Sequence, residues 1–215
     1  MGKNVKVKIC GLRSVKDIEV VNKYKPNFAG VIFAKSKRQV TIEQAKEMKA
    51  ALDKDIKLVG VFMNQSSDCV IETALDCGLD MIQLHGDEEL DILKKVKKET
   101  GLPVIKNIPV PDTTNDFVPE IWENIMRMYE READYILFDT FSGGKSGGTG
   151  KRFNLNLLPK MNKPFFVAGG VDPYNVKEIC DRANPFAVDV SSSLETDGMK
   201  DEEKIKTFFL NLEQA

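Results

Sequence analysis

Side chains with chemical potential stand at the ends of apolar runs, where a buried strand would give way to a loop. The clearest case is Tyr135–Phe138, an apolar run of strand length that ends in the acid Asp139. Five glycines follow between residues 143 and 150. Gly-rich backbone can present bare N–H groups to an anion, so Gly148 and Gly150 are candidate ligand contacts in a loop that could cover a cavity. A flexible surface loop is the alternative interpretation.

Two nucleotide-binding motifs can be tested on this Gly-rich loop, and neither fits. A Walker loop requires Gly, four residues and then Gly-Lys-Ser/Thr, but Lys145 stands where the first Gly should be and Arg152 follows Lys151. A dinucleotide fingerprint requires its glycines to open a helix, whereas Gly148-Thr149-Gly150 is followed closely by Phe153. Neither nucleotide motif is therefore predicted here.

Composition narrows the class of protein. The net charge is −2, so bulk charge gives no reason to expect a nucleic-acid or membrane partner. No apolar run approaches the length of a membrane span, and the first ten residues lack the core of a signal peptide. The four cysteines are scattered without a Cys-x-x-Cys pair, as expected for reduced thiols. We therefore expect a cytoplasmic protein.

The elements that would position these residues alternate regularly along the chain. Strands are predicted at Val5–Ile9, Phe28–Phe33, Lys57–Phe62, Met81–Leu84, Pro103–Ile108, Tyr135–Phe138, Phe165–Ala168 and Phe186–Val190. Helices are predicted at Val15–Tyr24, Ile42–Leu52, Cys69–Cys77, Glu88–Glu99, Val118–Arg131, Asn175–Arg182 and Asp201–Leu212. Such alternation favours a parallel sheet.

Eight βα units of near-equal length indicate an α/β fold, the closed (β/α)8 or TIM barrel. The alternative is an open doubly wound sheet, which usually has fewer strands. The segment Pro109–Asp116 is interpreted as a βα loop and not as a linker, so residues 1–215 are predicted to form a single domain.

Several helix starts carry capping signals. Ser14 precedes the first helix, and Thr41 with Gln44 forms a capping-box pattern. Ser67 or Asp68 is predicted to cap the third helix, and Asp172, followed by Pro173, the sixth.

A barrel would gather its active site at the carboxyl ends of the strands. The candidates there are Lys8, Cys10, Arg38, Asn64, Gln83, His85, Lys106, Asn107, Asp139, Gly169, Gly170, Asp189, Ser191 and Ser192. Polar residues on apolar strands are unfavourable unless they are paired or used. For Lys8, Gln83, Lys106 and Asp189 we favour buried pairs inside the barrel over a direct catalytic role. Lys8 with Asp189 is the most plausible pair, because the first and last strands are neighbours in a barrel.

The seventh and eighth strands end in glycines and serines. Gly169-Gly170 and Ser191-Ser192-Ser193 stand where many barrels bind phosphate, between the loops after these two strands. Glycine lets backbone N–H groups approach the phosphate. A Gly-Gly turn and a serine cap would explain each motif singly, but not their occurrence at the ends of consecutive strands.

Seven motifs together resemble the phosphoribosylanthranilate isomerase family of tryptophan biosynthesis. They are Lys8-Ile9-Cys10-Gly11, Lys35-Ser36-Lys37-Arg38, Gln83-Leu84-His85-Gly86, Leu137-Phe138-Asp139, Gly147-Gly148-Thr149-Gly150-Lys151, Ala168-Gly169-Gly170 and Val188-Asp189-Val190-Ser191-Ser192. The resemblance covers residues 5 to about 209 and implies a phosphate-binding barrel without metal or organic cofactor. Its partner would be a small phosphosugar substrate, and the protein a monomer or homodimer.

The resemblance implies an Amadori rearrangement of N-(5-phosphoribosyl)anthranilate to the 1-deoxyribulose 5-phosphate. By this analogy Asp139 is the general acid that opens the furanose ring, and Cys10 the general base that removes the C2′ proton. Arg38 would hold the anthranilate carboxylate, with His85 and the glycines and serines named above as further substrate contacts. From the residues alone, Cys10 could equally be a buried small hydrophobe and Arg38 part of a solvated basic run.

Two positions depart from the family pattern. Ala34 stands where an aromatic-Pro pair is common, and Ser193 replaces a glycine. A left-handed backbone at Ser193 would cost roughly 1–2 kcal/mol and weaken phosphate binding. The alternative functions are a Schiff-base lyase using Lys106 or Lys8, and an inactive phosphate-ligand-binding barrel.

Overall fold

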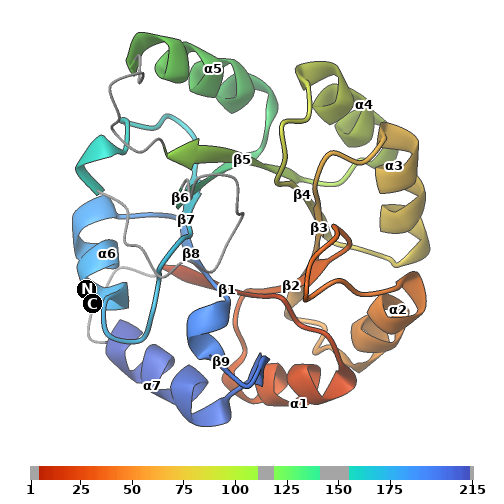
Figure 1. Cartoon of the computed structure of the whole chain (residues 1–215), viewed down its shortest axis with the longest axis vertical. Coiled ribbons are helices and arrows are strands. Elements are labelled where there is room, and N and C mark those ends of the chain that lie inside the picture. Colours follow the sequence, from red (N-terminus) through yellow and green to blue (C-terminus); the bar gives the residue numbers. More distant parts are fainter. Residues whose placement is uncertain (1–4, 111–118, 141–154, 214–215) are drawn as a thin grey trace.

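The strands close into a ring. The computed structural model describes residues 5–110, 119–140 and 155–213, and within them eight parallel strands form a closed barrel in the order β1 to β8. Figure 1 shows the helices as an outer layer around this ring. The barrel strands are β1 (Lys6–Cys10), β2 (Phe28–Ile32), β3 (Lys57–Phe62), β4 (Met81–Leu84), β5 (Val104–Val110), β6 (Tyr135–Thr140), β7 (Phe165–Val167) and β8 (Ala187–Val190). The predicted barrel is confirmed, and the open sheet is wrong because β1 pairs with β8, Lys8 opposite Asp189.

Helices follow most of the strands. They are α1 (Val15–Tyr24), α2 (Ile42–Ala51), α3 (Ser67–Asp76), α4 (Leu90–Thr100), α5 (Pro119–Glu132), α6 (Val176–Ala183) and α7 (Glu202–Leu212), with the short 3-10 helices η1 (Leu155–Leu157) and η2 (Ser192–Leu194). No helix in the described part of the chain is both long and apolar enough to cross a membrane.

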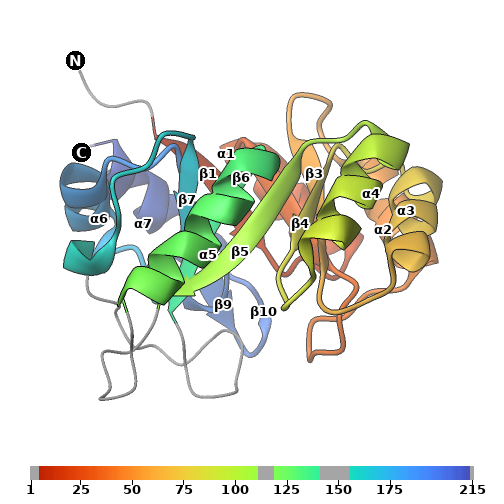
Figure 2. The ribbon, with the colours of Figure 1, turned by 90° about the horizontal axis from the view of Figure 1, so that it is seen from above.

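A small hairpin that was not predicted follows η2. It pairs β9 (Glu195–Thr196) with β10 (Met199–Lys200) in antiparallel fashion. Asp197 and Gly198, at the turn, both have positive φ, 51° and 77°, as a type I′ turn requires. Figure 2 shows the hairpin at the end of the barrel toward which β5 points, the end that carries the strands' carboxyl termini.

Local capping signals account for two helix starts. The Ser14 hydroxyl accepts the backbone N–H of Asp17 at 3.3 Å, and Thr41 and Gln44 form the predicted reciprocal capping box. Two other predictions were wrong in detail. Ser66 caps α3, because its hydroxyl accepts the N–H at the third helical position. Asp172 caps only a turn, and α6 begins four residues later.

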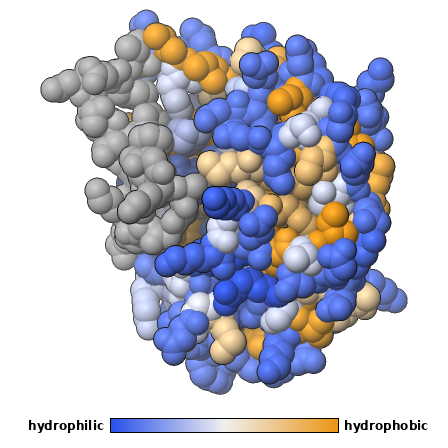
Figure 3. Space-filling view, turned by 45° about the vertical axis from the view of Figure 1, so that its right-hand side comes forward, coloured by the Kyte–Doolittle hydropathy of each residue, from blue (hydrophilic) through white to orange (hydrophobic). Residues whose placement is uncertain are grey.

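Strand alternation divides the apolar side chains into two layers. The larger cluster fills the space between strands and helices, and a smaller one fills the barrel interior, namely Phe28, Val59, Met81, Ile105, Leu137, Phe166, Ala168 and Ala187. Outside, the face in Figure 3 is mostly hydrophilic with apolar side chains in small groups. The apolar interior therefore stops below the carboxyl end of the barrel, where the polar candidates lie.

Candidate active site

The carboxyl end of the barrel holds a cavity of about 370 Å³. Most of the candidates at the strand ends line it: Cys10, Arg38, Gln83, His85, Asp139, Gly169, Gly170, Asp189, Ser191 and Ser192. The candidates Lys8, Asn64, Lys106 and Asn107 do not line this cavity. The other two predicted contacts, Gly148 and Gly150, lie outside the described residues. Residues that are up to 182 positions apart in the sequence are thus brought to one concave surface by the closure of the sheet.

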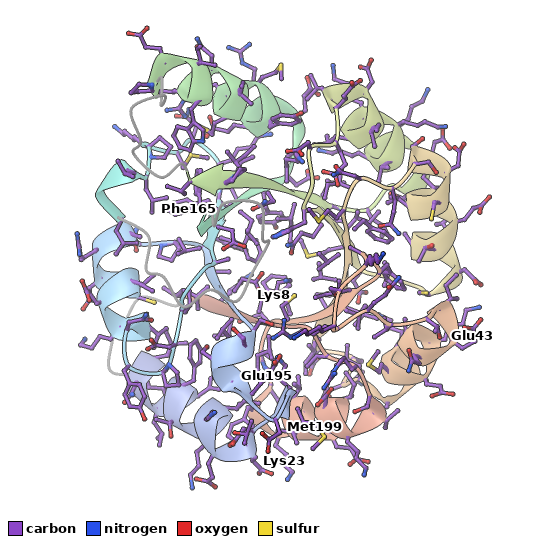
Figure 4. All side chains as sticks on the ribbon, in the orientation of Figure 1. Lys8, Lys23, Glu43, Phe165, Glu195 and Met199 are labelled. Atoms are coloured by element: carbon purple, nitrogen blue, oxygen red, sulfur yellow. The ribbon has the colours of Figure 1, made fainter. Side chains whose placement is uncertain are left out.

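Lys8 and Asp189 form the predicted buried pair. Lys8 Nζ lies 2.8 Å from Asp189 Oδ2, and the lysine side chain is fully buried. Figure 4 places Lys8 at the ring of strands, near its centre. Burial opposes a charge here, but the negative charges of Asp189 and Cys10 outweigh it, so the pKa of Lys8 is raised. The raised pKa favours the cationic form of Lys8 beside the cavity.

Cys10 shares this environment. Burial raises the pKa of its thiol above the ordinary value of 9.0, while the ammonium groups of Lys8 and Lys200 pull it back down. Gly30 provides the space in which thiol and ammonium meet: a Cβ added there would lie 2.9 Å from Cys10 Sγ and 3.2 Å from Lys8 Nζ. The thiolate of Cys10, once formed, has a fixed cation as its neighbour.

Asp139 is the last residue but one of β6 and lies beside His85 in the cavity wall. Asp139 Oδ2 lies 3.5 Å from His85 Nε2, and His85 Nδ1 lies 2.9 Å from Gln83 Nε2. In this orientation the Gln83 amide donates to Nδ1, which leaves the imidazole proton on Nε2, directed at the carboxyl group. The ring is thereby held where it can orient Asp139.

Arg38 is neither free nor simply solvated. Its Nε and Nη2 donate to the two carboxylate oxygens of Glu195 at 2.9 and 2.8 Å. The guanidinium remains partly exposed and lines the cavity. Glu195 was not singled out from the sequence, since it lies 157 positions away from Arg38.

The loops after β7 and β8 leave backbone donors unused. Gly169 and Gly170 have φ of 77° and 70°, a conformation that glycine adopts without strain. The N–H groups of Gly169, Gly170, Ser192 and Ser193 meet no acceptor among the residues that the structure describes. Four such donors at the ends of two consecutive strands offer a place for an anion.

The chain is similar in sequence to known proteins. The family profile described as N-(5'phosphoribosyl)anthranilate (PRA) isomerase matches residues 7–211. The chain belongs to this isomerase family. The N-(5'-phosphoribosyl)anthranilate isomerase of Clostridium acetobutylicum is 44% identical over 212 residues, which cover 97% of this chain and 98% of the relative. The activity predicted from the motifs, isomerisation of phosphoribosylanthranilate in tryptophan biosynthesis, is confirmed by this membership.

Solved structures of the isomerase family superpose on the chain. A monomeric variant of the dimeric isomerase from Thermotoga maritima shares 29% of its sequence with a TM-score of 0.80, covering 98% of this chain and all of that one. A family member in complex with reduced 1-(o-carboxyphenylamino)-1-deoxyribulose 5-phosphate shares 28% with a TM-score of 0.80, with the same coverage of both chains.

The two departures from the family pattern are harmless to this isomerase's backbone. Ser193 lies in η2, and it is absent from the four non-glycine residues of positive φ in the described part of the chain. The expected penalty for a left-handed serine therefore does not arise. Its hydroxyl donates to the Val171 carbonyl at 2.6 Å and ties the two phosphate-side loops together. Ala34 is buried and lines the cavity.

Lys106 is placed differently from the expectation. It shares its strand face with Val104 and Ile108, which pack between strands and helices, and it does not line the cavity. Its ammonium lies 2.6 Å from Glu88 Oε2, with both side chains almost fully buried. The prediction of a buried pair for Lys106 is confirmed. The predicted location inside the barrel is wrong, because the pair lies on the side of the strand that faces the helices.

Neither candidate lysine for a Schiff-base lyase is available to a carbonyl substrate. Lys106 is occupied outside the cavity, and Lys8 is held protonated by Asp189. A Schiff base requires a neutral amine, so the lyase alternative loses its nucleophile.

Proposed function

We propose that this isomerase carries out the Amadori rearrangement with Asp139 as general acid and Cys10 as general base. One observation carries the assignment. The thiol and the carboxyl group face a single cavity that has a guanidinium, Arg38, in its wall, together with four backbone N–H groups that meet no acceptor in the described part of the chain. The substrate has the matching groups, a carboxylate on its aromatic ring, a phosphate on its sugar and the reacting carbons between them.

The first step is ring opening. Asp139, in its carboxylic acid form, transfers a proton to the furanose ring oxygen as the C1′–O bond breaks, and the nitrogen lone pair forms the C1′–N double bond of a protonated Schiff base. The neighbouring imidazole of His85 holds the carboxyl group in position through Nε2. General acid catalysis of this kind contributes roughly 10²–10⁴-fold.

The second step is proton removal. The Cys10 thiolate takes the proton from C2′, the C2′–H electrons form the C1′–C2′ double bond, and the C–N π electrons return to nitrogen. The resulting enolamine takes up a proton at C1′ and releases the proton of its C2′ hydroxyl group, as the O–H electrons form the C2′–O double bond of the ketone. Lys8 stabilises the thiolate electrostatically. Of the groups that oppose the effect of burial on the Cys10 pKa, Lys8 contributes most.

Substrate binding is assigned to the remaining residues. Arg38 anchors the carboxylate, because a guanidinium suits that group geometrically. Gly169, Gly170, Ser191 and Ser192 bind the phosphate, and His85 contacts the sugar. We assign Gly148 and Gly150 to a loop that covers the bound substrate. We further propose that residues 1–215 act as one domain, in the cytoplasm, as a monomer or homodimer.

The test is the turnover of two near-isosteric variants. Cys10→Ser and Asp139→Asn should each lose about 10²–10⁴-fold in kcat while KM changes little, since a general acid or base acts in the transition state. Turnover is followed by the loss of anthranilate-type fluorescence from freshly made substrate. In the parent, kcat/KM should follow a bell-shaped pH profile, and each variant should lack one limb.

Near-isosteric changes keep the core volume, so the melting temperature should stay close to the parent value. A Cys10→Ser variant with parental kcat and an unchanged melting temperature would return Cys10 to the role of a packing residue, and Lys8 would become the first candidate for the base.

A further inference from the structure

A buried carboxylate holds Arg38 from outside the cavity. Glu195 is absent from the cavity lining among the described residues, and its side chain is 7% exposed against 27% for Arg38. The contact is bidentate, through Nε and Nη2 of the arginine. Glu195 is the first residue of β9, in the hairpin that follows η2, and Figure 4 labels it. A fork with one edge fixed in this way can present only its other edge to a ligand.

Lys200, at the end of the same hairpin, completes the arrangement. Its ammonium donates to Glu195 Oε1 at 2.8 Å, to the Cys10 carbonyl at 2.7 Å and to the Ser191 carbonyl at 3.1 Å. An ammonium has three donors, so all of them are used. The side chain is 1% exposed. Lys200 therefore joins the carboxylate behind Arg38 to the strand end that carries the thiol and to the phosphate-side loop.

The summed charge of Arg38, Lys200 and Glu195 favours an anionic ligand. Burial opposes ionisation of Glu195, but Arg38 and Lys200 outweigh it and lower its pKa, so the carboxylate is charged. Burial lowers the pKa of Lys200 and Glu195 opposes this shift; with the ammonium charged, two cations and one anion leave a net positive charge. Arg38 Nη1, on the edge away from Glu195, donates to no acceptor among the described residues. The remaining positive charge and the remaining donor edge thus coincide at the cavity wall.

We propose that Glu195, hydrogen-bonded to Lys200, is the positioning residue that aims the free edge of Arg38 at the ligand's aryl carboxylate. This deepens the proposed function and rests on it. Glu195 does not touch the substrate. It fixes one rotamer of a long, flexible side chain before the substrate arrives, so that the binding of the carboxylate does not have to immobilise the arginine. Through Lys200 the same network sets the position of this anchor relative to Cys10.

The first experiment compares Glu195→Gln with a matched control. Glutamine keeps the shape but loses the charge and one acceptor, so KM should rise about tenfold, the low end for a hydrogen bond to a charged group. The kcat should stay within about twofold, because the anchor acts equally in ground and transition states. Asp197→Asn removes the same charge two residues along, at an exposed position, and should leave both constants at parental values.

A merely structural role for Glu195 would predict a different outcome in a double-mutant cycle. In an Arg38→Ala background, Glu195→Gln should have no further effect on KM, since the residue it positions is gone. An undiminished effect of Glu195→Gln in that background would overturn the proposal.

Ligand binding separates this inference from the proposed function. Two non-reacting probes are compared by equilibrium titration: the reduced 1-(o-carboxyphenylamino)-1-deoxyribulose 5-phosphate and its analogue without the carboxylate. The carboxylate should improve affinity in the parent, and this gain should shrink about tenfold in Glu195→Gln while the affinity of the analogue stays constant. Arg38→Lys, which keeps the charge but not the fork, should lose the gain in the same way and serves if Glu195→Gln does not fold.

An intact carboxylate gain in folded Glu195→Gln would refute the positioning role whatever the turnover of the parent. Conversely, a parent that binds both probes as expected but fails to convert phosphoribosylanthranilate would refute the proposed function and leave the positioning role standing.

Discussion

Gly30→Ala should impair the active site out of proportion to its effect on stability. The added Cβ would lie 2.9 Å from Cys10 Sγ and 3.1 Å from Cys10 Cα, whereas ordinary contact begins at 3.4 Å. The sulfur must therefore retreat by about 0.5 Å, the difference between 3.4 and 2.9 Å. Because a misplacement of about 1 Å can cost 10²-fold in rate, half of it should lower kcat on the order of tenfold.

The backbone contact adds a stability term. A Cβ so close to Cys10 Cα cannot be relieved by a rotamer change, so β1 and β2 must separate slightly. Overpacking of this kind destabilises by about 1–3 kcal/mol, which for a chain of this size lowers Tm by roughly 2–12 °C.

Gly101→Ala is the matched control. Gly101 ends α4 with φ of 67°, and an added Cβ would meet nothing within 4 Å. The left-handed backbone alone should cost about 1–2 kcal/mol, a stability loss in the same range. Both variants are assayed by thermal unfolding and by fluorescence turnover. Parental kcat in Gly30→Ala, or equal losses of kcat in both variants, would refute the argument that Gly30 sets the position of the thiol.

Three further outcomes are expected. Arg38→Ala should raise KM more than it lowers kcat, and an unchanged KM in steady-state kinetics would return this arginine to a solvated surface role. Inorganic phosphate should inhibit competitively, and sulfate soaked into crystals should lie between Gly170 and Ser192; density elsewhere only would count against the assigned phosphate contacts. Lys106→Met should lower the free energy of unfolding by about 3–5 kcal/mol in denaturant titrations, because it leaves Glu88 charged, buried and unpaired. Burial opposes the charge of Glu88, but the ammonium of Lys106 outweighs burial and lowers the pKa of Glu88. The pair therefore stabilises the fold above pH 4.5, and this contribution is lost as the pH falls through the depressed pKa of Glu88. A parent whose stability stays constant from pH 6 down to pH 2 would contradict this.

Periodicity was sufficient to predict the barrel and its strands. Each predicted strand is present with its ends displaced by at most two residues, as at Pro103–Ile108, where β5 runs from Val104 to Val110. Uniform spacing of apolar runs constrains topology strongly, because few folds accommodate eight βα units. Element ends depend on individual hydrogen bonds, which is why the cap of α3 fell on Ser66 and not on its neighbours.

The cavity-lining residues could be predicted because a barrel places its strand ends together. The residues that hold these cavity-lining side chains in position could not be predicted. Glu195 and Lys200 lie on strands of two residues, too short to show an alternating pattern. The dipeptide Asp197-Gly198 was an available signal, since it favours a hairpin turn, but it gives no indication that Glu195 would face an arginine from the second loop.

Lys106 illustrates the other limit. Its polarity on an apolar strand correctly indicated a buried pair, yet a strand exposes alternate residues to the interior and to the helices. Which of the two faces a lysine occupies follows from the register of the whole strand. Lys106 stands between Val104 and Ile108 on the same face, and these two apolar neighbours were the signal that could have placed it toward the helices.

The seam between β1 and β8 has a consequence for synthesis of the protein on the ribosome. The groups that set the charge around the thiol, Asp189 and Lys200, are translated 181 and 190 positions after the residues they contact. Until they emerge, a nascent chain contains a cysteine and a lysine with no barrel to hold them, and loop closure over so long a separation is slow. Catalytic competence must therefore wait for Asp189 and Lys200, and a chain released before they are made would be inert as well as unstable.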